Sequence, residues 1–210
     1  MGRERGSFAY LTWTDPSGSS AIVVIGLLLA AGGGRRFGGP KAPYVHQGER
    51  LVDRGVRLLR EAGCQEVVVV LGAWVGEVAD ATVVVNSDWE SGQASSLLKG
   101  LDSLPVGAER VCVLLVDQIG MTSRVISRVI SRVVDSPEEM VAAGFEDLFS
   151  PPIAFTRQHF IPLMSDLRQA LSDGKRGDSG ARHYFQEVGG LILQVDDLAL
   201  LEDLDEPPTN

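Results

Sequence analysis

Cysteine is scarce in this sequence, with only Cys64 and Cys112 among 210 residues. Each lies beside a valine-rich run, and neither has a second cysteine or a histidine at the spacing of a metal site. This pattern argues against a disulfide framework and against a structural zinc site. We expect both thiols to be reduced and to lie in the core, which is typical of a cytoplasmic protein.

Long hydrophobic runs are also missing. The longest apolar stretch, residues 21–31, has 11 residues, whereas a membrane-spanning helix needs about 20. It follows Arg3 and Arg5, as the apolar part of a signal peptide would, but the polar segment 15–20 interrupts that layout. We therefore expect a cytoplasmic protein without a membrane partner.

Aromatic residues make up only 6% of the chain. Acidic residues outnumber basic ones, which gives a formal net charge of −9. Nucleic-acid binding relies on clustered Lys and Arg, so this charge argues against a nucleic-acid partner. A small anionic substrate is compatible with it where positive charge is concentrated locally. The abundance of Val, Leu, Ile and Ala predicts parallel strands buried on both faces, and so indicates the α/β class.

From residue 21 onwards, short apolar runs alternate with longer amphipathic segments, as in a series of βαβ units. Residues 1–20 lack such a period, so we expect a flexible extension there and one domain over residues 21–210. The expected strands are 22–29, 66–71, 82–86, 110–116, 139–143, 153–156 and 191–195. The expected helices are 51–62, 74–80, 93–104, 123–135, 158–171 and 179–188. Right-handed crossovers wind such elements into a three-layer α/β/α sandwich with a mostly parallel, Rossmann-like sheet.

Ligands of open α/β sheets bind beyond the carboxyl ends of the strands. The loop after the first strand, residues 29–41, carries five glycines, Arg35, Arg36 and Lys41. Its backbone amides can converge on phosphate oxygens, and its cations add positive charge. The loop has no Walker A sequence, and Phe37 breaks the Gly-x-Gly-x-x-Gly register that a redox enzyme with a dinucleotide cofactor would use. A flexible surface loop is the alternative interpretation.

Carboxylates follow the strand 110–116 and recur near the end of the sequence. Asp117 stands at the carboxyl end of that strand, where its oxygen atoms could bind a hard cation; a turn or a helix cap is the alternative. An unpaired carboxylate at this edge would require a cation. Asp203 or Asp205 could add a second ligand, although an acidic solvated tail fits them equally well.

Aromatic and imidazole side chains offer few further site candidates. We expect Trp74 to pack on a helix against the sheet. For Trp89, packing and contact with a nucleobase are both open interpretations. His46, His159 and His183 share no spacing with carboxylates or cysteines, so we expect surface or packing roles for them.

The glycine-rich loop resembles the Leu-Ala-Ala-Gly-x-Ser-x-Arg-Met-Gly-x-x-Lys signature of the molybdenum cofactor nucleotidyltransferase superfamily, above all its cytidylyltransferase branch. Arg36, Gly38 and Lys41 occupy the charged and glycine positions of that signature. Gly34 stands in place of the family's Ser, and Phe37 in place of its Met.

Later segments extend this resemblance in the same order along the chain. Residues 86–92, followed by Ser-Ser-Leu at 95–97, are similar to an Asn-x-x-Trp-x-x-Gly segment; residues 177–182 match Gly-Asp-x-Gly-Ala-Arg; and residues 203–207 resemble Asp-Ile-Asp-Thr-Pro. Two features depart from the family. Ile119 replaces the Pro of its Asp-x-Pro sequence, and residues 150–153 lack the His of its Gly-His-Pro-Val segment.

The resemblance implies a magnesium-dependent nucleotidyltransferase of the nucleotide-diphospho-sugar transferase fold. It implies transfer of CMP from CTP to the phosphate of a molybdopterin cofactor, with Arg36, Lys41 and Asp117 as catalytic residues. The implied nucleotide-binding residues are Ala31, Gly32, Gly33, Gly34, Arg36, Gly38, Lys41, Asn86, Gly92 and Ser96, and the implied Mg²⁺ ligands are Asp117, Asp203 and Asp205. The alternatives are a guanylyltransferase, a sugar-phosphate nucleotidyltransferase, and a nucleotide-binding protein that has lost catalysis.

Overall fold

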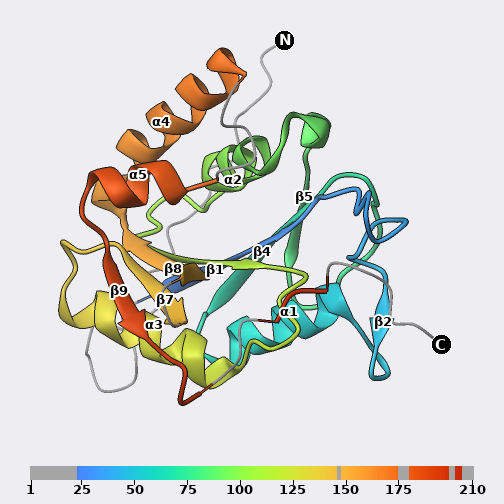
Figure 1. The fold of residues 1–210 in the computed structure, drawn as a ribbon, viewed down its shortest axis with the longest axis horizontal. Coiled ribbons are helices and arrows are strands. Elements are labelled where there is room, and N and C mark those ends of the chain that lie inside the picture. Colours follow the sequence, from blue (N-terminus) through green and yellow to red (C-terminus); the bar gives the residue numbers. More distant parts are fainter. Residues whose placement is uncertain (1–22, 146–147, 175–179, 199–201, 205–210) are drawn as a thin grey trace, which may run out of the picture.

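A seven-stranded sheet forms the centre of the protein in a computed structural model, which describes residues 23–145, 148–174, 180–198 and 202–204 (Figure 1). The strand order is β5-β4-β1-β6-β8-β7-β9. The strands are β1 (Val24–Ala30), β4 (Glu66–Leu71), β5 (Thr82–Val85), β6 (Arg110–Leu115), β7 (Val141–Phe145), β8 (Leu148–Thr156) and β9 (Leu191–Gln194). Only β8 runs opposite to its neighbours, so the sheet is mostly parallel, as predicted.

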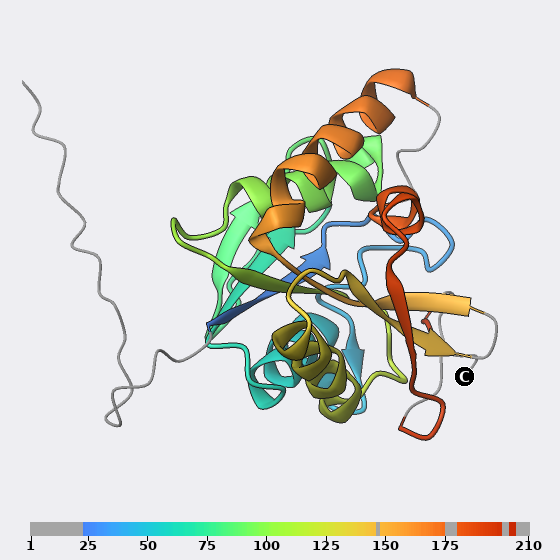
Figure 2. The same ribbon diagram turned by 90° about the vertical axis from the view of Figure 1, so that its left-hand side faces the viewer.

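Helices cover both faces of this sheet (Figures 1 and 2). One face carries α1 (Leu51–Glu61) and α3 (Ser123–Asp135). The other carries α2 (Gln93–Asp102), α4 (Phe160–Asp173) and α5 (Arg182–Glu187). Two short 3-10 helices, η1 (Trp89–Ser91) and η2 (Arg157–His159), complete this side. The predicted three-layer α/β/α sandwich is therefore confirmed.

The central strand β1 is buried along its whole length, because its alternating side chains enter both cores. Leu28 packs on the α1 side and Leu27 on the α2 side. Glycines let both helices approach this strand closely: a Cβ on Gly55 of α1 would lie 2.7 Å from Leu28 Cδ2, and one on Gly100 of α2 would lie 2.6 Å from Leu27 Cδ1. The strand that leads into the glycine-rich loop is thereby fixed from both faces.

Most elements match the expected ranges, and two, β4 and α3, match them residue for residue. Strand β7 is shifted towards the C-terminus by two residues, and β8 begins earlier, at Leu148, because its first part pairs with β7. The expected helix 158–171 begins as η2 and continues as α4. Residues 1–22 and 179, where an extension and the start of a helix are expected, lie outside the described residues.

The helix expected at residues 74–80 is wrong: this segment is an irregular loop. Val75 is exposed while Val78 is buried, and Trp74 packs against the α1 core with the Arg50 guanidinium 5.8 Å from the centroid of its ring. A segment of seven residues beside two glycines is too short for its apolar residues to distinguish a helix from a loop. A small hairpin of β2 (Val45–His46) and β3 (Glu49–Arg50) was not predicted; it turns at Gln47 and Gly48, both with positive φ.

The parallel pairing brings several carboxyl ends to one edge of the sheet. Leu29 of β1 lies opposite Leu115 of β6, and Ala30 lies opposite Leu71 of β4. Because β8 is antiparallel and its Ile153 pairs with Val113, the preceding residues 150–152 extend towards that same edge. Within the part of the chain that the structure describes, no helix is long and apolar enough to cross a membrane.

Candidate active site

The glycine-rich loop leaves β1 at this edge and is folded by its own backbone. The carbonyl oxygen of Gly34 accepts hydrogen bonds from the amides of Gly38 (2.9 Å) and Gly39 (3.2 Å). Gly34 has a φ of 58°, and a Cβ there would collide with the carbonyl oxygen of Gly39. Only glycine fits this position without strain. The structure therefore folds this part of the loop as a defined turn, which favours a binding role over the alternative of a flexible surface loop.

Phe37 anchors the loop to the rest of the protein. Its ring is buried and lies edge-on to the ring of Tyr44, with 4.8 Å between the ring centroids. It also packs with Leu51 at the start of α1 and with Leu204 near the end of the chain. A large aromatic ring therefore does the packing at the position where the resembled family carries Met, and the neighbouring Arg36 stays exposed.

Lys41 joins the glycine-rich loop to the carboxyl end of β6. Its ammonium Nζ lies 2.8 Å from Oδ2 of Asp117, and the side chains are 12% and 26% exposed, respectively. The amide of Val116 donates to the carbonyl of Leu29 at 3.1 Å, which extends the pairing of β1 and β6 up to this contact. Lys41 therefore balances the charge of Asp117 in this structure, and the metal-binding role of Asp117 remains a prediction.

One oxygen of Asp117 is still available to a cation. Among the described residues, Oδ1 has no hydrogen-bonding partner, while Oδ2 accepts from Lys41. Asp203 lies alongside, since Gln118 and Asp203 form an antiparallel β-bridge and the amide of Leu204 donates to the carbonyl of Asp117 at 2.9 Å. Two carboxylate residues thus lie on neighbouring segments at the sheet edge, and hard oxygen donors of this kind suit Mg²⁺. Asp205 lies outside the described residues.

Two residues that the sequence analysis missed hold the turn after Asp117. Arg54 reaches up from α1, and its guanidinium donates to the carbonyls of Gln118 (3.1 Å), Ile119 (2.7 Å) and Met121 (2.7 Å). Burial lowers the pKa of Arg54 from its ordinary value. The one signal for Arg54 in the sequence was its position as a charged residue beside the apolar positions of a predicted helix.

Gln118 is the second of these residues, and its side chain is almost fully buried. Its Nε2 donates to Ser150 Oγ at 3.0 Å and to the carbonyl of Pro151 at 2.7 Å, and its Oε1 accepts from the amide of Leu115 at 3.3 Å. This side chain therefore ties the end of β6 to the segment where the resembled family has its histidine.

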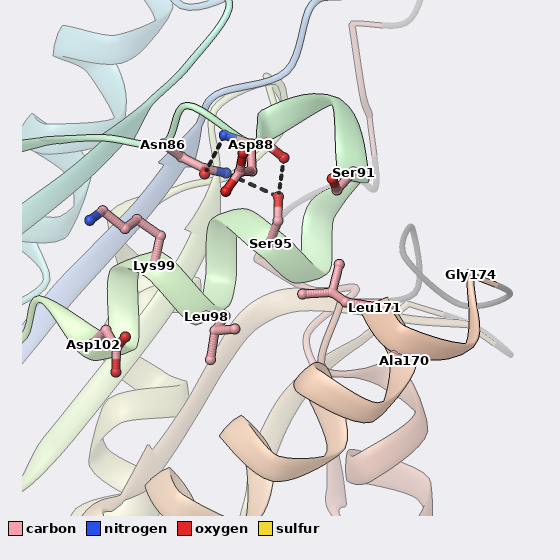
Figure 3. Close-up of a pocket in the computed structure, with 10 residues that line it drawn as sticks. All are labelled: Asn86, Asp88, Ser91, Ser95, Leu98, Lys99, Asp102, Ala170, Leu171 and Gly174. Carbon is pink, nitrogen blue, oxygen red and sulfur yellow. Dashed lines mark hydrogen bonds between the residues drawn. The ribbon is translucent and has the colours of Figure 1, made fainter.

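The segment after β5 forms a wall beside the glycine-rich loop. Asn86 is buried, and its Nδ2 donates to the hydroxyl of Ser95 at 3.0 Å (Figure 3). It also donates to the hydroxyl of Ser96 at 3.1 Å. Trp89 packs so closely that a Cβ on Gly33 would lie 2.8 Å from its Cζ3. The structure therefore supports the packing interpretation of Trp89, and it shows Asn86 and Ser96 bonded to each other. Contact of Asn86 and Ser96 with a nucleotide remains a prediction. The same holds for Gly92, which has a φ of 102° and directly precedes α2.

A groove of about 550 Å³ lies between α2 and α4 (Figure 3). Asn86 and Asp88 line one end of it, and Lys99 and Asp102 lie further along α2. None of its lining residues comes from the glycine-rich loop or from the end of β6. We therefore place the candidate site at the sheet edge around Lys41 and not in this groove.

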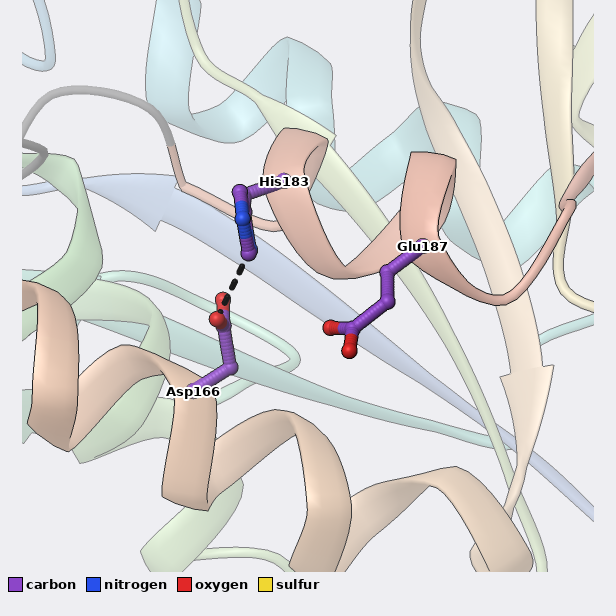
Figure 4. Close-up of side chains that lie close together, drawn as sticks. All are labelled: Asp166, His183 and Glu187. Carbon is purple, nitrogen blue, oxygen red and sulfur yellow. Dashed lines mark hydrogen bonds and ion pairs between the residues drawn. The ribbon is translucent and has the colours of Figure 1, made fainter.

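His159 and His183 bond to residues outside the glycine-rich loop and the end of β6. His159 is buried, with its Nδ1 3.0 Å from the hydroxyl of Tyr184, which agrees with a packing role. His183 of α5 pairs with Asp166 of α4, with 2.8 Å between Nδ1 and Oδ1, and Glu187 lies one turn further along α5 (Figure 4). Burial raises the pKa of Tyr184, and the two carboxylates raise it further.

The segment similar to Gly-Asp-x-Gly-Ala-Arg is only partly described, because residues 177–179 lie outside the described ranges. The described part contacts other elements of the fold. Arg182 stacks its guanidinium 4.6 Å from the centroid of the Phe149 ring, and Gly180 lies against the side chain of Gln93 at the start of α2.

Several known proteins resemble this chain in sequence and in fold. The model of the MobA-like NTP transferase domain family matches residues 26–190. The chain is 36% identical over 191 residues to the nicotine blue oxidoreductase of Paenarthrobacter nicotinovorans, covering 87% of this chain and 92% of that protein. It is 46% identical over 52 residues to a probable molybdenum cofactor guanylyltransferase of Opitutus terrae, a match that covers 25% of this chain and 26% of that protein.

The crystal structure of Rv0371c from Mycobacterium tuberculosis superposes with a TM-score of 0.67 at 23% identity, covering 90% and 95% of the two chains. The predicted nucleotide-diphospho-sugar transferase fold is confirmed.

Proposed function

The chain is a nucleotidyltransferase enzyme of the MobA-like NTP transferase domain family, and we propose that it transfers CMP from CTP to a phosphorylated acceptor. The observation that carries this proposal is the contact of 2.8 Å between Lys41 of the glycine-rich loop and Asp117 at the end of β6. It joins a phosphate-binding turn to a carboxylate that can hold a cation. Transfer of a nucleotidyl group requires both functions in one place.

The glycine-rich loop would bind the β- and γ-phosphates through its backbone amides. A phosphate oxygen of the acceptor attacks the α-phosphorus; the new P–O bond forms as the bond to the β-phosphate oxygen breaks, and pyrophosphate leaves. An ionised phosphate needs no general base to act as the nucleophile. Arg36 and Lys41 then offset the negative charge that grows on the leaving pyrophosphate, and this kind of preorganised charge is the main source of catalysis in such transfers.

Mg²⁺ is the cation we assign to Asp117, with Asp203 as a second carboxylate. The fit rests on Oδ1 of Asp117, which accepts no hydrogen bond from the described residues, and on the bridge that brings Asp203 alongside. When bound, the ion would neutralise charge on the phosphate oxygens. Asp117 would hold the ion in place, while Lys41 would turn from the carboxylate towards the phosphates.

The choice of CTP rests on Ala31, since guanylyl members of the family tend to carry Gly at this position. Ala31 is buried, and its carbonyl oxygen accepts a hydrogen bond of 2.9 Å from the amide of Ala73. GTP is the principal alternative, and the similarity to a probable guanylyltransferase favours it. A sugar-phosphate nucleotidyltransferase would use the same loop and metal.

The acceptor we favour is the phosphate of a molybdopterin cofactor, in keeping with the role named for the guanylyltransferase relative. The absent histidine near Ser150 makes a protein that binds nucleotides without catalysis an alternative. The relative named as an oxidoreductase favours a second candidate function, the reduction of a small aromatic compound. The interruption of the dinucleotide register at Phe37 speaks against that function. A cytoplasmic location is part of the proposal, since both cysteines are free and buried.

The test is pyrophosphate release from each of CTP, GTP, ATP and UTP with Mg²⁺, with and without molybdopterin cofactor, followed by mass spectrometry of the product. We expect release with CTP and a cytidylyl product. Release with GTP alone would replace CTP by GTP. The absence of any release, together with oxidation of NADH or NADPH by a dye substrate, would overturn the transferase proposal. Melting temperatures with each nucleotide supply a readout that is independent of the acceptor, because a ligand that binds only the folded state stabilises it.

A further inference from the structure

The side chain of Arg54 supports the turn after Asp117 through hydrogen bonds. It lies on α1, half-buried, and its two terminal nitrogens donate to three carbonyl oxygens of the turn, those of Gln118, Ile119 and Met121. Among the described residues, no carboxylate lies within ion-pair distance of it. Among the described residues, the charged guanidinium of Arg54 therefore donates hydrogen bonds to backbone oxygens alone. This is unusual for a half-buried arginine.

This turn is closed by hydrogen bonds where the resembled family has proline. The amide of Ile119 donates to the carbonyl of Asp117 at 2.9 Å, and the amide of Met121 donates to that of Gln118 at 3.2 Å. A proline at position 119 could not make the first of these bonds, because it has no N–H. The stiffness that a proline ring would bring has to come from another group.

We propose that Arg54 is a positioning residue that fixes the direction of the Asp117 carboxylate by holding the carbonyls of the turn behind it. The proposal rests on the metal-binding role proposed for Asp117. The planar guanidinium suits the task, because one rigid group can donate to several converging acceptors, whereas the ammonium of a lysine is a single flexible point charge. Gln118 supports the same turn from the opposite side through Ser150 and Pro151.

The alternative is that Arg54 merely stabilises the packing of α1 against the turn. Such a role would lower the free energy of unfolding without changing the metal site in the molecules that remain folded. A positioning role would change the affinity for the metal and the turnover number while the protein is still folded.

The test compares R54K and R54Q with a matched control, R57Q. Arg57 lies one turn further along α1, is 47% exposed, and pairs with Glu49 and Glu61. We expect folded R54K protein to bind Mn²⁺ at least about tenfold more weakly in a titration followed by electron paramagnetic resonance. With a triphosphate and Mg²⁺ at saturation, its kcat should fall at least about tenfold, while KM for the triphosphate changes less. R57Q should match the parent protein in both measurements.

Two further measurements test the same proposal. D117N must abolish the Mn²⁺ signal that R54K weakens; if it does not, the metal is elsewhere and the proposal falls. Hydrogen exchange at the amides of residues 118–121 should be faster in R54K, with the rest of the sheet unchanged. A variant that binds Mn²⁺ like the parent, or one that only loses thermal stability, would overturn the positioning role. If the parent transfers no nucleotide at all, the proposed function fails, and the Mn²⁺ titration alone decides on Arg54.

Discussion

At the scale of single residues, Lys41 is where two distant parts of the sequence meet. Its ammonium contacts Asp117 across 76 positions of the chain, and the pair is mostly shielded from solvent. The sequence indicated each residue separately, one from the glycine-rich loop and one from the end of a strand. It could not indicate their contact, because a lysine side chain can extend in many directions from its position on a loop.

Replacement of Lys41 by Ala is the first prediction. The variant loses a cation that we propose contacts the phosphates, so triphosphate binding or turnover should fall at least about tenfold, as charge-assisted hydrogen bonds contribute roughly 1.5 to 3 kcal/mol. Isothermal titration calorimetry and pyrophosphate release measure the two effects. Lys99→Ala is the matched control, since Lys99 lies on the groove between α2 and α4. Equal binding and turnover in the Lys41 variant and the parent would remove the loop from the site.

Replacement of Asp117 by Asn is the second prediction. Asn keeps the size of the side chain and an oxygen acceptor for Lys41 but loses the charge that we propose binds a divalent cation. We expect a folded protein that has lost its Mg²⁺-dependent turnover. Because the pair with Lys41 is partly exposed, the melting temperature should change by only a few degrees. Turnover at the parental rate would show that Asp117 serves only to close the loop.

At the scale of elements, the sequence predicted what depends on strong local patterns. Buried strands such as β4 and the amphipathic helix α3 have the expected bounds, because runs of valine or a helical period dictate them. The helix expected at 74–80 is wrong, and the β2–β3 hairpin was missed, since both segments are short and are shaped by contacts with α1. The contacts of Arg54 and Gln118 were likewise hidden, because most of their partners are backbone groups that no sequence pattern marks.

The glycine-rich loop gives the prediction at this scale. Gly34→Ala places a Cβ on the carbonyl oxygen of Gly39 and requires a positive φ, so the turn has to open. We expect weaker triphosphate binding, measured by calorimetry, with little change in the far-ultraviolet circular dichroism. Gly39→Ala is the control, because a Cβ there meets no atom within 4 Å. Similar affinities for the two variants would mean that the observed turn is not required for binding.

At the scale of the whole molecule, burial in the core changes the pKa of the two cysteine thiols. Burial raises the pKa of Cys64 to about 12 and raises the pKa of Cys112 well above its usual value. In the unfolded chain both thiols would ionise near pH 8.5. The folded protein therefore keeps protons that the unfolded chain releases, and this part of its stability is present below about pH 8.5 and lost as the pH rises towards 12.

Urea unfolding at several pH values above 8 tests this expectation. The free energy of unfolding should fall with pH by up to about 1.4 kcal/mol per pH unit for each thiol. In the double variant Cys64→Ala/Cys112→Ala this dependence should be shallower, whatever its stability at neutral pH. Identical slopes for the variant and the parent would contradict the burial of the two thiols.

The ion pair between Lys41 and Asp117 also dictates the order in which ligands can bind. A divalent cation that arrives alone has to compete with the ammonium for the carboxylate, whereas a triphosphate offers the ammonium other oxygens and frees the carboxylate. The two ligands must therefore favour each other's binding by the same factor. Lys41→Ala should consequently bind Mn²⁺ more tightly than the parent when no nucleotide is present, although it binds the triphosphate more weakly. Equal or weaker Mn²⁺ binding by this variant would contradict the competition. The lysine would thus weaken metal binding until the nucleotide arrives.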